Sequence, residues 1–186
     1  MLLALALATA APSASEQAVS LFWQACVDGG MTMSGSISAG DPAEMPKKLA
    51  ARFNRPTSLK LWKFAEQPAV AMLAVAEYRP ANHGVAERCV VLSRTANLEE
   101  SADRLIALQG KRPYKPIERA PGATVHAISG NEVDGWVMVV RELGDHVMLE
   151  AVQLDSATPK VRKTAYNRVM AKMLAERFEA PHVVPR

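Results

Sequence analysis

Two cysteines are the residues of this sequence whose chemistry is easiest to assign. Cys26 and Cys89 are the two cysteines of the chain, and an even number of cysteines in an exported protein indicates a disulfide framework. Neither has a nearby histidine or a Cys-x-x-Cys partner, which argues against a catalytic thiol. We therefore predict a bridge between Cys26 and Cys89. The alternative is two separate buried thiols.

Soft-metal ligands occur in two short patterns with one intervening residue. Met31-Thr32-Met33 supplies two thioethers, and His146-Val147-Met148 supplies an imidazole and a thioether. These groups suit Cu(I) in an oxidising compartment, and alternate residues of a strand share one face. The candidate metal ligands are therefore Met31, Met33, His146 and Met148. The competing interpretation is that methionine fills gaps in the core, as it commonly does.

Positive charge is concentrated in the C-terminal segment, which we predict to be helical. The candidate anion contacts there are Lys160, Arg162, Lys163, Arg168 and Lys172. Such a helix would contact an anionic envelope component, meaning lipid headgroups, a cell-wall polymer or an acidic protein surface. The alternative is an ordinary solvated outer face of a packed helix.

Enzyme motifs are absent from the sequence. It contains no Gly-x-Ser-x-Gly elbow, no phosphate-cradling glycine loop and no His-Glu-x-x-His pattern. No catalytic residue and no cofactor is therefore assigned. A small enzyme whose active site assembles from distant residues stays open as an alternative.

Apolar spacing and turn residues predict the elements that position these side chains. The expected helices are Glu16–Val27, a segment capped by Asp41 and carrying Met45, Leu49 and Phe53, a segment capped by Asn97 and ending at Gly110, and Thr158–Phe178. The expected strands are Ser58–Phe64, Ala69–Tyr78, Arg88–Arg94, Thr124–Ser129, Val133–Glu142 and His146–Leu154. Met31–Gly40, Arg79–Ala86 and Lys111–Gly122 are expected to be irregular connections.

This order predicts an α+β fold with an antiparallel sheet. Two runs of three strands, each preceded by a helix, would form the sheet, with the helices packed on one face and a long C-terminal helix closing the chain. Gly144-Asp145 suits a two-residue hairpin turn. That register places His146, Met148 and Glu150 beside Arg141 on one face, and an apolar set on the other.

Composition and the N-terminal segment predict the compartment. The net charge of +3 and the aromatic content of 5% are too low to indicate a nucleic-acid-binding protein. Met1–Ala11 is apolar apart from Thr9, yet it is shorter than the about 20 residues of a membrane span. Ala8-Thr9-Ala10 matches a small-x-small cleavage site, with Ser13-Ala14-Ser15 as a second choice.

We therefore predict a signal segment over residues 1–15 and a single domain over residues 16–186, periplasmic or secreted, with no transmembrane span in the mature protein. No Lys or Arg precedes the apolar run, and a buried N-terminal helix is the alternative.

The layout resembles a group of uncharacterised small exported two-cysteine proteins of proteobacteria. The resemblance covers roughly residues 21–108 and depends on an early helix with Phe22, Trp23 and Cys26, a second helix, and the pair Cys89-Val90. It implies a periplasmic location and the disulfide, and it brings no activity.

The function expected from the sequence is therefore an exported binding or interaction module whose ligand is not identified. Its partner would be an anionic envelope component or a protein. The alternatives are a small periplasmic enzyme with a dispersed active site and a structural accessory subunit of an envelope complex.

Overall fold

The fold comes from a computed structural model. It describes residues 11–28, 45, 47–50, 52–53, 55–62, 69–82, 85–109, 125–131, 136–154, 163–164 and 167–168. The helices are α1 (Ala14–Phe22), a π-helix η1 (Trp23–Asp28), α2 (Lys47–Ala50) and α3 (Leu98–Gln109). The strands are β1 (Ser58–Trp62), β2 (Val70–Asn82), β3 (Val85–Ser93), β4 (Val125–Asn131), β5 (Trp136–Leu143) and β6 (His146–Leu154).

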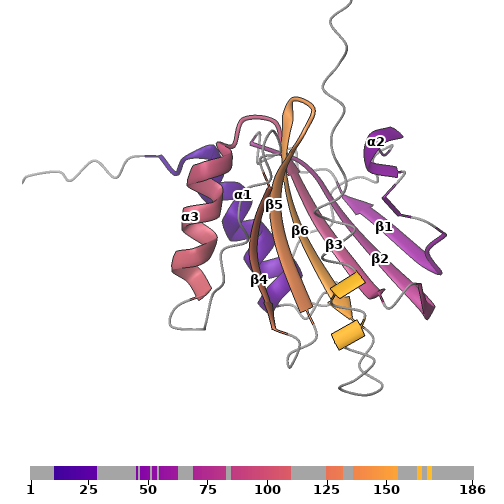
Figure 1. The fold of residues 1–186 in the computed structure, drawn as a ribbon. Helices are drawn as coiled ribbons and strands as arrows, with labels where there is room; N and C mark the ends of the chain where they lie inside the picture. Colours follow the sequence, from indigo (N-terminus) through magenta and orange to yellow (C-terminus); the bar gives the residue numbers. More distant parts are fainter. Residues whose placement is uncertain are drawn as a thin grey trace, which may run out of the picture.

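The six strands form one antiparallel sheet in the order β1-β2-β3-β6-β5-β4. Each half of the sheet is one run of three consecutive strands, and the last strands of the two runs, β3 and β6, pair at the centre (Figure 1). The predicted α+β class and the antiparallel sheet built from two three-stranded runs are confirmed.

Helices α1, η1 and α3 cover one side of this sheet, which we call the first face. Figure 1 shows α1 and α3 side by side there, and apolar residues of both helices share a core with Leu73, Cys89 and Leu149 of the strands. Ser13 caps α1 by accepting a hydrogen bond from the backbone N–H of Glu16 at 3.1 Å. Burial of this apolar surface holds the helices against the sheet.

The opposite side, the second face, is also buried. Its core includes Met72, Val90, Val139 and Met148, and α2 adds the fully buried Leu49. Helices therefore contact both faces, whereas we expected them on one face. The almost continuously apolar β2 is consistent with this, because a strand covered on both sides does not alternate between polar and apolar residues.

The β5–β6 hairpin has the predicted turn and register. Leu143 pairs with His146 across Gly144-Asp145, and Gly144 has a φ of 68°. A positive φ at the first turn residue favours glycine, which lacks the Cβ that makes this conformation costly. The register places Met148 and Glu150 on the second face together with Arg141, as the alternation of the sequence predicts.

Several predicted boundaries differ from those observed. The second helix, α2, is limited to Lys47–Ala50 among the described residues, so Phe53 lies after it and not within it. The first helix begins at Ala14 and not at Glu16, because Ser13 caps it two residues earlier than expected. The predicted loop Arg79–Ala86 is mostly strand: β2 continues to Asn82 and β3 begins at Val85. Pro80 is accommodated where the register of β2 and β3 shifts between Glu77 and Asn82, in keeping with the preference of proline for irregular positions in sheets.

Several expected segments lie outside the described residues. They are the loop Met31–Gly40, the connection Lys111–Gly122 and most of the long C-terminal helix. Of that helix, residues 163–164 and 167–168 are described, and they are helical and exposed.

Candidate functional site

A buried carboxylate lies near the middle of the second face. Glu150 is on β6, between Val90 of β3 and Val139 of β5, and its side chain is completely buried. A carboxylate in such an apolar place is costly unless cations and hydrogen bonds compensate it. Its neighbours therefore determine what the site can do.

Three arginines surround this carboxylate and form, with it, what we call the arginine–glutamate cluster. Arg141 of β5 donates from Nη2 to Oε2 of Glu150 at 2.9 Å, and it is as buried as its partner. Arg52, between α2 and β1, donates to the same oxygen at 3.2 Å. Nη1 of Arg88, on β3, lies 3.3 Å from Oε1.

The strand register explains this convergence. Arg88 on β3 pairs with Val152, two residues after Glu150, and Arg141 on β5 pairs with Met148, two residues before it. Both arginines are therefore diagonal neighbours of Glu150 on the same face of the sheet. Alternate residues of one face and diagonal cross-strand neighbours are within reach of long side chains. Arg52 enters from outside the sheet, and its carbonyl accepts a hydrogen bond of 2.7 Å from Nη1 of Arg88.

The cluster keeps Glu150 ionised. Burial by itself raises the pKa of Glu150, but the charges of Arg88, Arg52 and Arg141, with the hydrogen bond from Arg141, outweigh burial and lower this pKa to about 2. Opposite charges favour the ionised form strongly where little water screens them. At neutral pH the cluster is therefore one carboxylate among three guanidinium groups.

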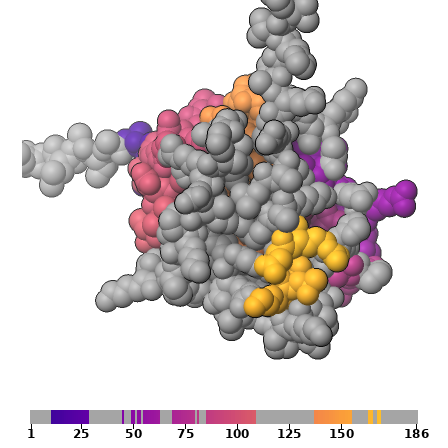
Figure 2. Space-filling model, in the orientation of Figure 1, coloured from indigo at the N-terminus to yellow at the C-terminus, as the bar shows by residue number. Residues whose placement is uncertain are grey.

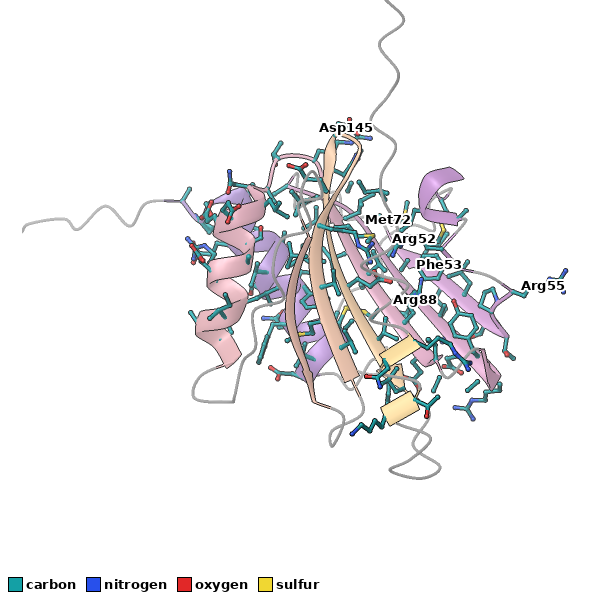
Figure 3. All side chains as sticks on the ribbon, in the orientation of Figure 1. Arg52, Phe53, Arg55, Met72, Arg88 and Asp145 are labelled. Atoms are coloured by element: carbon teal, nitrogen blue, oxygen red, sulfur yellow. A yellow bond between two sulfur atoms is a disulfide. The ribbon has the colours of Figure 1, made fainter. Side chains whose placement is uncertain are left out.

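Aromatic and apolar side chains enclose the outer part of the cluster. Figure 3 shows Arg52, Phe53, Met72 and Arg88 gathered over the sheet, whereas Arg55 points away from it. The guanidinium carbon of Arg88 lies 6.0 Å from the centre of the Phe53 ring, within the range of a cation–π contact.

Tyr78, also buried in the second face, is electrostatically coupled to this cluster. Burial raises the pKa of its phenol, Arg88 lowers that pKa in part, and Glu150 raises it further. The phenol is therefore neutral at physiological pH and keeps its O–H donor.

Arg88 retains hydrogen-bonding capacity inside the protein. Its Nε is buried and makes no hydrogen bond to any residue that the structure describes, and the same is true of Oε1 of Glu150. Arg88 is also one of the two outer arginines, with 11% of its side chain exposed. An arginine N–H donor of this kind suits carboxylate or phosphate oxygens.

The predicted disulfide is present. Cys26 of η1 and Cys89 of β3 are bonded, with their Cα atoms 5.5 Å apart and a sequence separation of 63. Both are buried in the core of the first face. The bridge therefore ties the N-terminal helical segment to a central strand, on the side of the sheet opposite to the arginine–glutamate cluster.

Of the four proposed copper ligands, the structure describes His146 and Met148, two positions apart on β6. Met148 is fully buried in the second face, whereas His146 lies at the β5–β6 turn with its Nδ1 2.6 Å from Asp145 and its Nε2 3.3 Å from Nε of Arg94. Met31 and Met33 lie outside the described residues. Within the described part of the chain, His, Cys, Asp and Glu form no group of three or more suited to a metal ion.

The basic C-terminal segment is described in part. Lys163 and Arg168 are helical and exposed, and Figure 2 shows the segments 163–164 and 167–168 (yellow) at the molecular surface. Lys160, Arg162 and Lys172 lie outside the described residues. Anion contact by this segment stays a prediction. No helix in the described ranges combines the length and the apolar character of a membrane span.

Sequence reasoning placed Arg141 beside Glu150 but did not identify the cluster. A usable signal was present for two of its residues: Glu150 interrupts the apolar run Val147–Val152, and Arg141 directly follows the apolar run Val137–Val140. Arg88 follows Glu87 in the sequence and is less conspicuous. Arg52 carries no such signal, because it precedes the sheet in the sequence.

Comparison with known protein families and with curated proteins identified no relative of this chain. No family model matches the chain, and no curated protein is significantly similar to it.

Proposed function

We propose that this chain is an exported binding module whose second face, around Arg88, takes a small organic or inorganic anion. The observation that carries the proposal is the ionic cluster inside an apolar sheet face. Apolar residues of similar size in place of a buried ion pair often leave stability unchanged or increase it. A cluster of this kind is therefore better explained by a role in binding than by stability.

The chemistry of the ligand follows from Arg88 and its neighbours. Nε of Arg88 is a buried donor without a hydrogen-bond acceptor in the described part of the chain, and Tyr78 supplies a neutral phenol. Carboxylate and phosphate oxygens match guanidinium donors. The apolar side chains of Phe53 and Met72 lower the local dielectric constant and strengthen such a contact.

Two features support export. The disulfide between Cys26 and Cys89 is of the kind that persists in oxidising compartments. The apolar run that ends near Ala11 has the composition of the core of a signal segment. A periplasmic or secreted location is part of the proposal.

Thermal unfolding in the presence of two probes, sodium phosphate and sodium butyrate, tests the anion site, with potassium chloride at equal ionic strength as the reference. A ligand that binds the folded state raises the melting temperature as its concentration increases. We expect at least one probe to raise it beyond the effect of chloride.

The matched variants are Arg88→Gln and Arg79→Gln. Arg79 is on β2 with 76% of its side chain exposed. Each variant is compared with its own melting temperature without probe, so a change in basal stability does not affect the result. Loss of the shift in Arg88→Gln and its retention in Arg79→Gln support the proposal. No shift in the wild type with either probe, or an undiminished shift in Arg88→Gln, contradicts it.

A further inference from the structure

The N-terminal segment just before α1 takes part in the fold, and this bears on where an exported precursor is cut. The sequence offers two small-x-small sites, one ending at Ala10 and one ending at Ser15. A cut after Ser15 removes Ser13 and Ser15 from the mature chain, whereas a cut after Ala10 keeps both. The contacts of these two serines therefore distinguish the sites.

Ser13 is the N-cap of α1 and also joins it to α3. Its Oγ accepts the backbone N–H of Glu16 at 3.1 Å and donates to Oε1 of Glu100 at 2.6 Å. Its backbone carbonyl accepts the N–H of Gln17 at 3.0 Å. Without Ser13 the first turn of α1 loses its cap, and Glu100 loses a donor.

Ser15 supports the beginning of the other helix. It is 1% exposed, and its Oγ accepts the backbone N–H of Asn97 at 2.8 Å. Asn97 in turn caps α3, because its Oδ1 accepts the N–H of Glu100 at 3.0 Å. A chain that begins at Glu16 lacks the buried Ser15 side chain, so the N–H of Asn97 at the start of α3 loses this acceptor.

We infer that the precursor is cleaved between Ala10 and Ala11, so that the mature chain begins at Ala11. The alternative bond one residue later, between Ala11 and Pro12, is disfavoured because proline has no N–H for a protease to bind. Ala11 and Pro12 are exposed. This inference rests on the proposed export, because the cleavage occurs during translocation.

The test is the intact mass of the protein isolated from its native cells, measured without reductant. The expected mass is that of residues 11–186 with one disulfide. A mass corresponding to residues 12–186 or 16–186 overturns the position of the cut and leaves export standing. A chain recovered with its N-terminal segment uncut and both thiols free overturns the cut and the proposed export together.

Two valine variants give an independent measure. A β-branched residue does not suit the small-residue position before the cut. Pulse–chase labelling follows processing within minutes, before the stability of the folded chain matters. We expect Ala10→Val to accumulate precursor and Ser15→Val to be processed at the wild-type rate. The reverse pattern places the cut after Ser15 and overturns the inference.

Discussion

At the scale of single residues, the position of Glu150 is the most unusual feature of the molecule. It is fully buried, and three guanidinium groups compensate its charge. The favourable interaction belongs to the cluster as a whole, because each arginine is also a buried or nearly buried cation that needs the carboxylate. Removal of the one negative charge therefore affects all four residues.

Glu150→Gln should lower the free energy of unfolding by about 3–5 kcal/mol at pH 7, because it leaves the surrounding guanidinium groups without their carboxylate. Urea unfolding followed by circular dichroism measures the change. Asp103→Asn makes the same chemical change on the exposed side of α3 and should shift the free energy by less than about 0.5 kcal/mol. Equal effects of the two variants would contradict the importance of the buried cluster.

The acid stability of the protein should depend on the same carboxylate. The pKa of Glu150 is about 2 in the folded protein and 4.5 as its ordinary value, so the unfolded state binds more protons between these values. The contribution to stability is complete above about pH 5 and is lost as the pH falls toward 2, with a total of about 3 kcal/mol. The free energy of unfolding in urea is measured between pH 2 and 7 for the wild type and for Glu150→Gln. The difference between the two proteins at each pH gives the contribution of Glu150.

This difference isolates Glu150 from the other titrating groups. Burial and the charge of Glu77 raise the pKa of Glu87. Its ionisation therefore changes the free energy of unfolding with pH in the direction opposite to that of Glu150. The hydrogen bond from Ser13 lowers the pKa of Glu100. Both contributions are common to the two proteins and cancel. A constant difference across this pH range would show that Glu150 does not titrate as described.

At the scale of elements, the helical segment at the N-terminus is held in three ways. Its apolar face packs on the sheet, Ser13 and Ser15 connect it to the start of α3, and the disulfide joins η1 to β3. The π-helical turns of η1 place Cys26 against the central part of the sheet.

Loss of the disulfide should destabilise the protein without changing its fold. The double variant Cys26→Ala/Cys89→Ala should unfold with a free energy lower by about 4 kcal/mol, as expected in the chain-entropy model for a closed loop of this length. Urea unfolding of the wild type with and without dithiothreitol measures this loss of free energy. The double variant is the control, because reductant should not change its unfolding. Unfolding of the wild type at the same urea concentration with and without reductant would contradict the prediction.

At the scale of the whole molecule, the sheet joins two similar halves at β3 and β6. Each half contributes three strands and one of the two longer helices. The two central strands have a partner on each side, and most of their side chains are buried, on both faces of the sheet. We therefore expect the seam between the halves to be the most stable part of the molecule.

Native-state hydrogen exchange should show this arrangement. Amides of β3 and β6 should exchange most slowly, by global unfolding, whereas those of β1 and β4, each with one partner strand among the described residues, should exchange through local opening. Mass spectrometry of peptides from each strand measures the rates. Protection of β1 equal to that of β3 would contradict the prediction.

The sequence by itself determined the features that depend on neighbours along the chain. The hairpin at Gly144, the apolar faces of the helices and the succession of helices and strands along the chain follow from local spacing and turn chemistry. The disulfide follows from a cysteine count of two. Arg141 lies nine residues from Glu150, within one hairpin, so the alternation of side chains was enough to place them on one face.

Tertiary structure alone decided the rest of the site. Arg52 is 98 residues from Glu150 along the chain, and Arg88 reaches it only because β3 pairs with β6 and not with another strand. The order of strands in a sheet is set by the packing of the complete core, which no local pattern records. The same packing buries the second face and so converts four ordinary charged residues into one ionic cluster inside the protein.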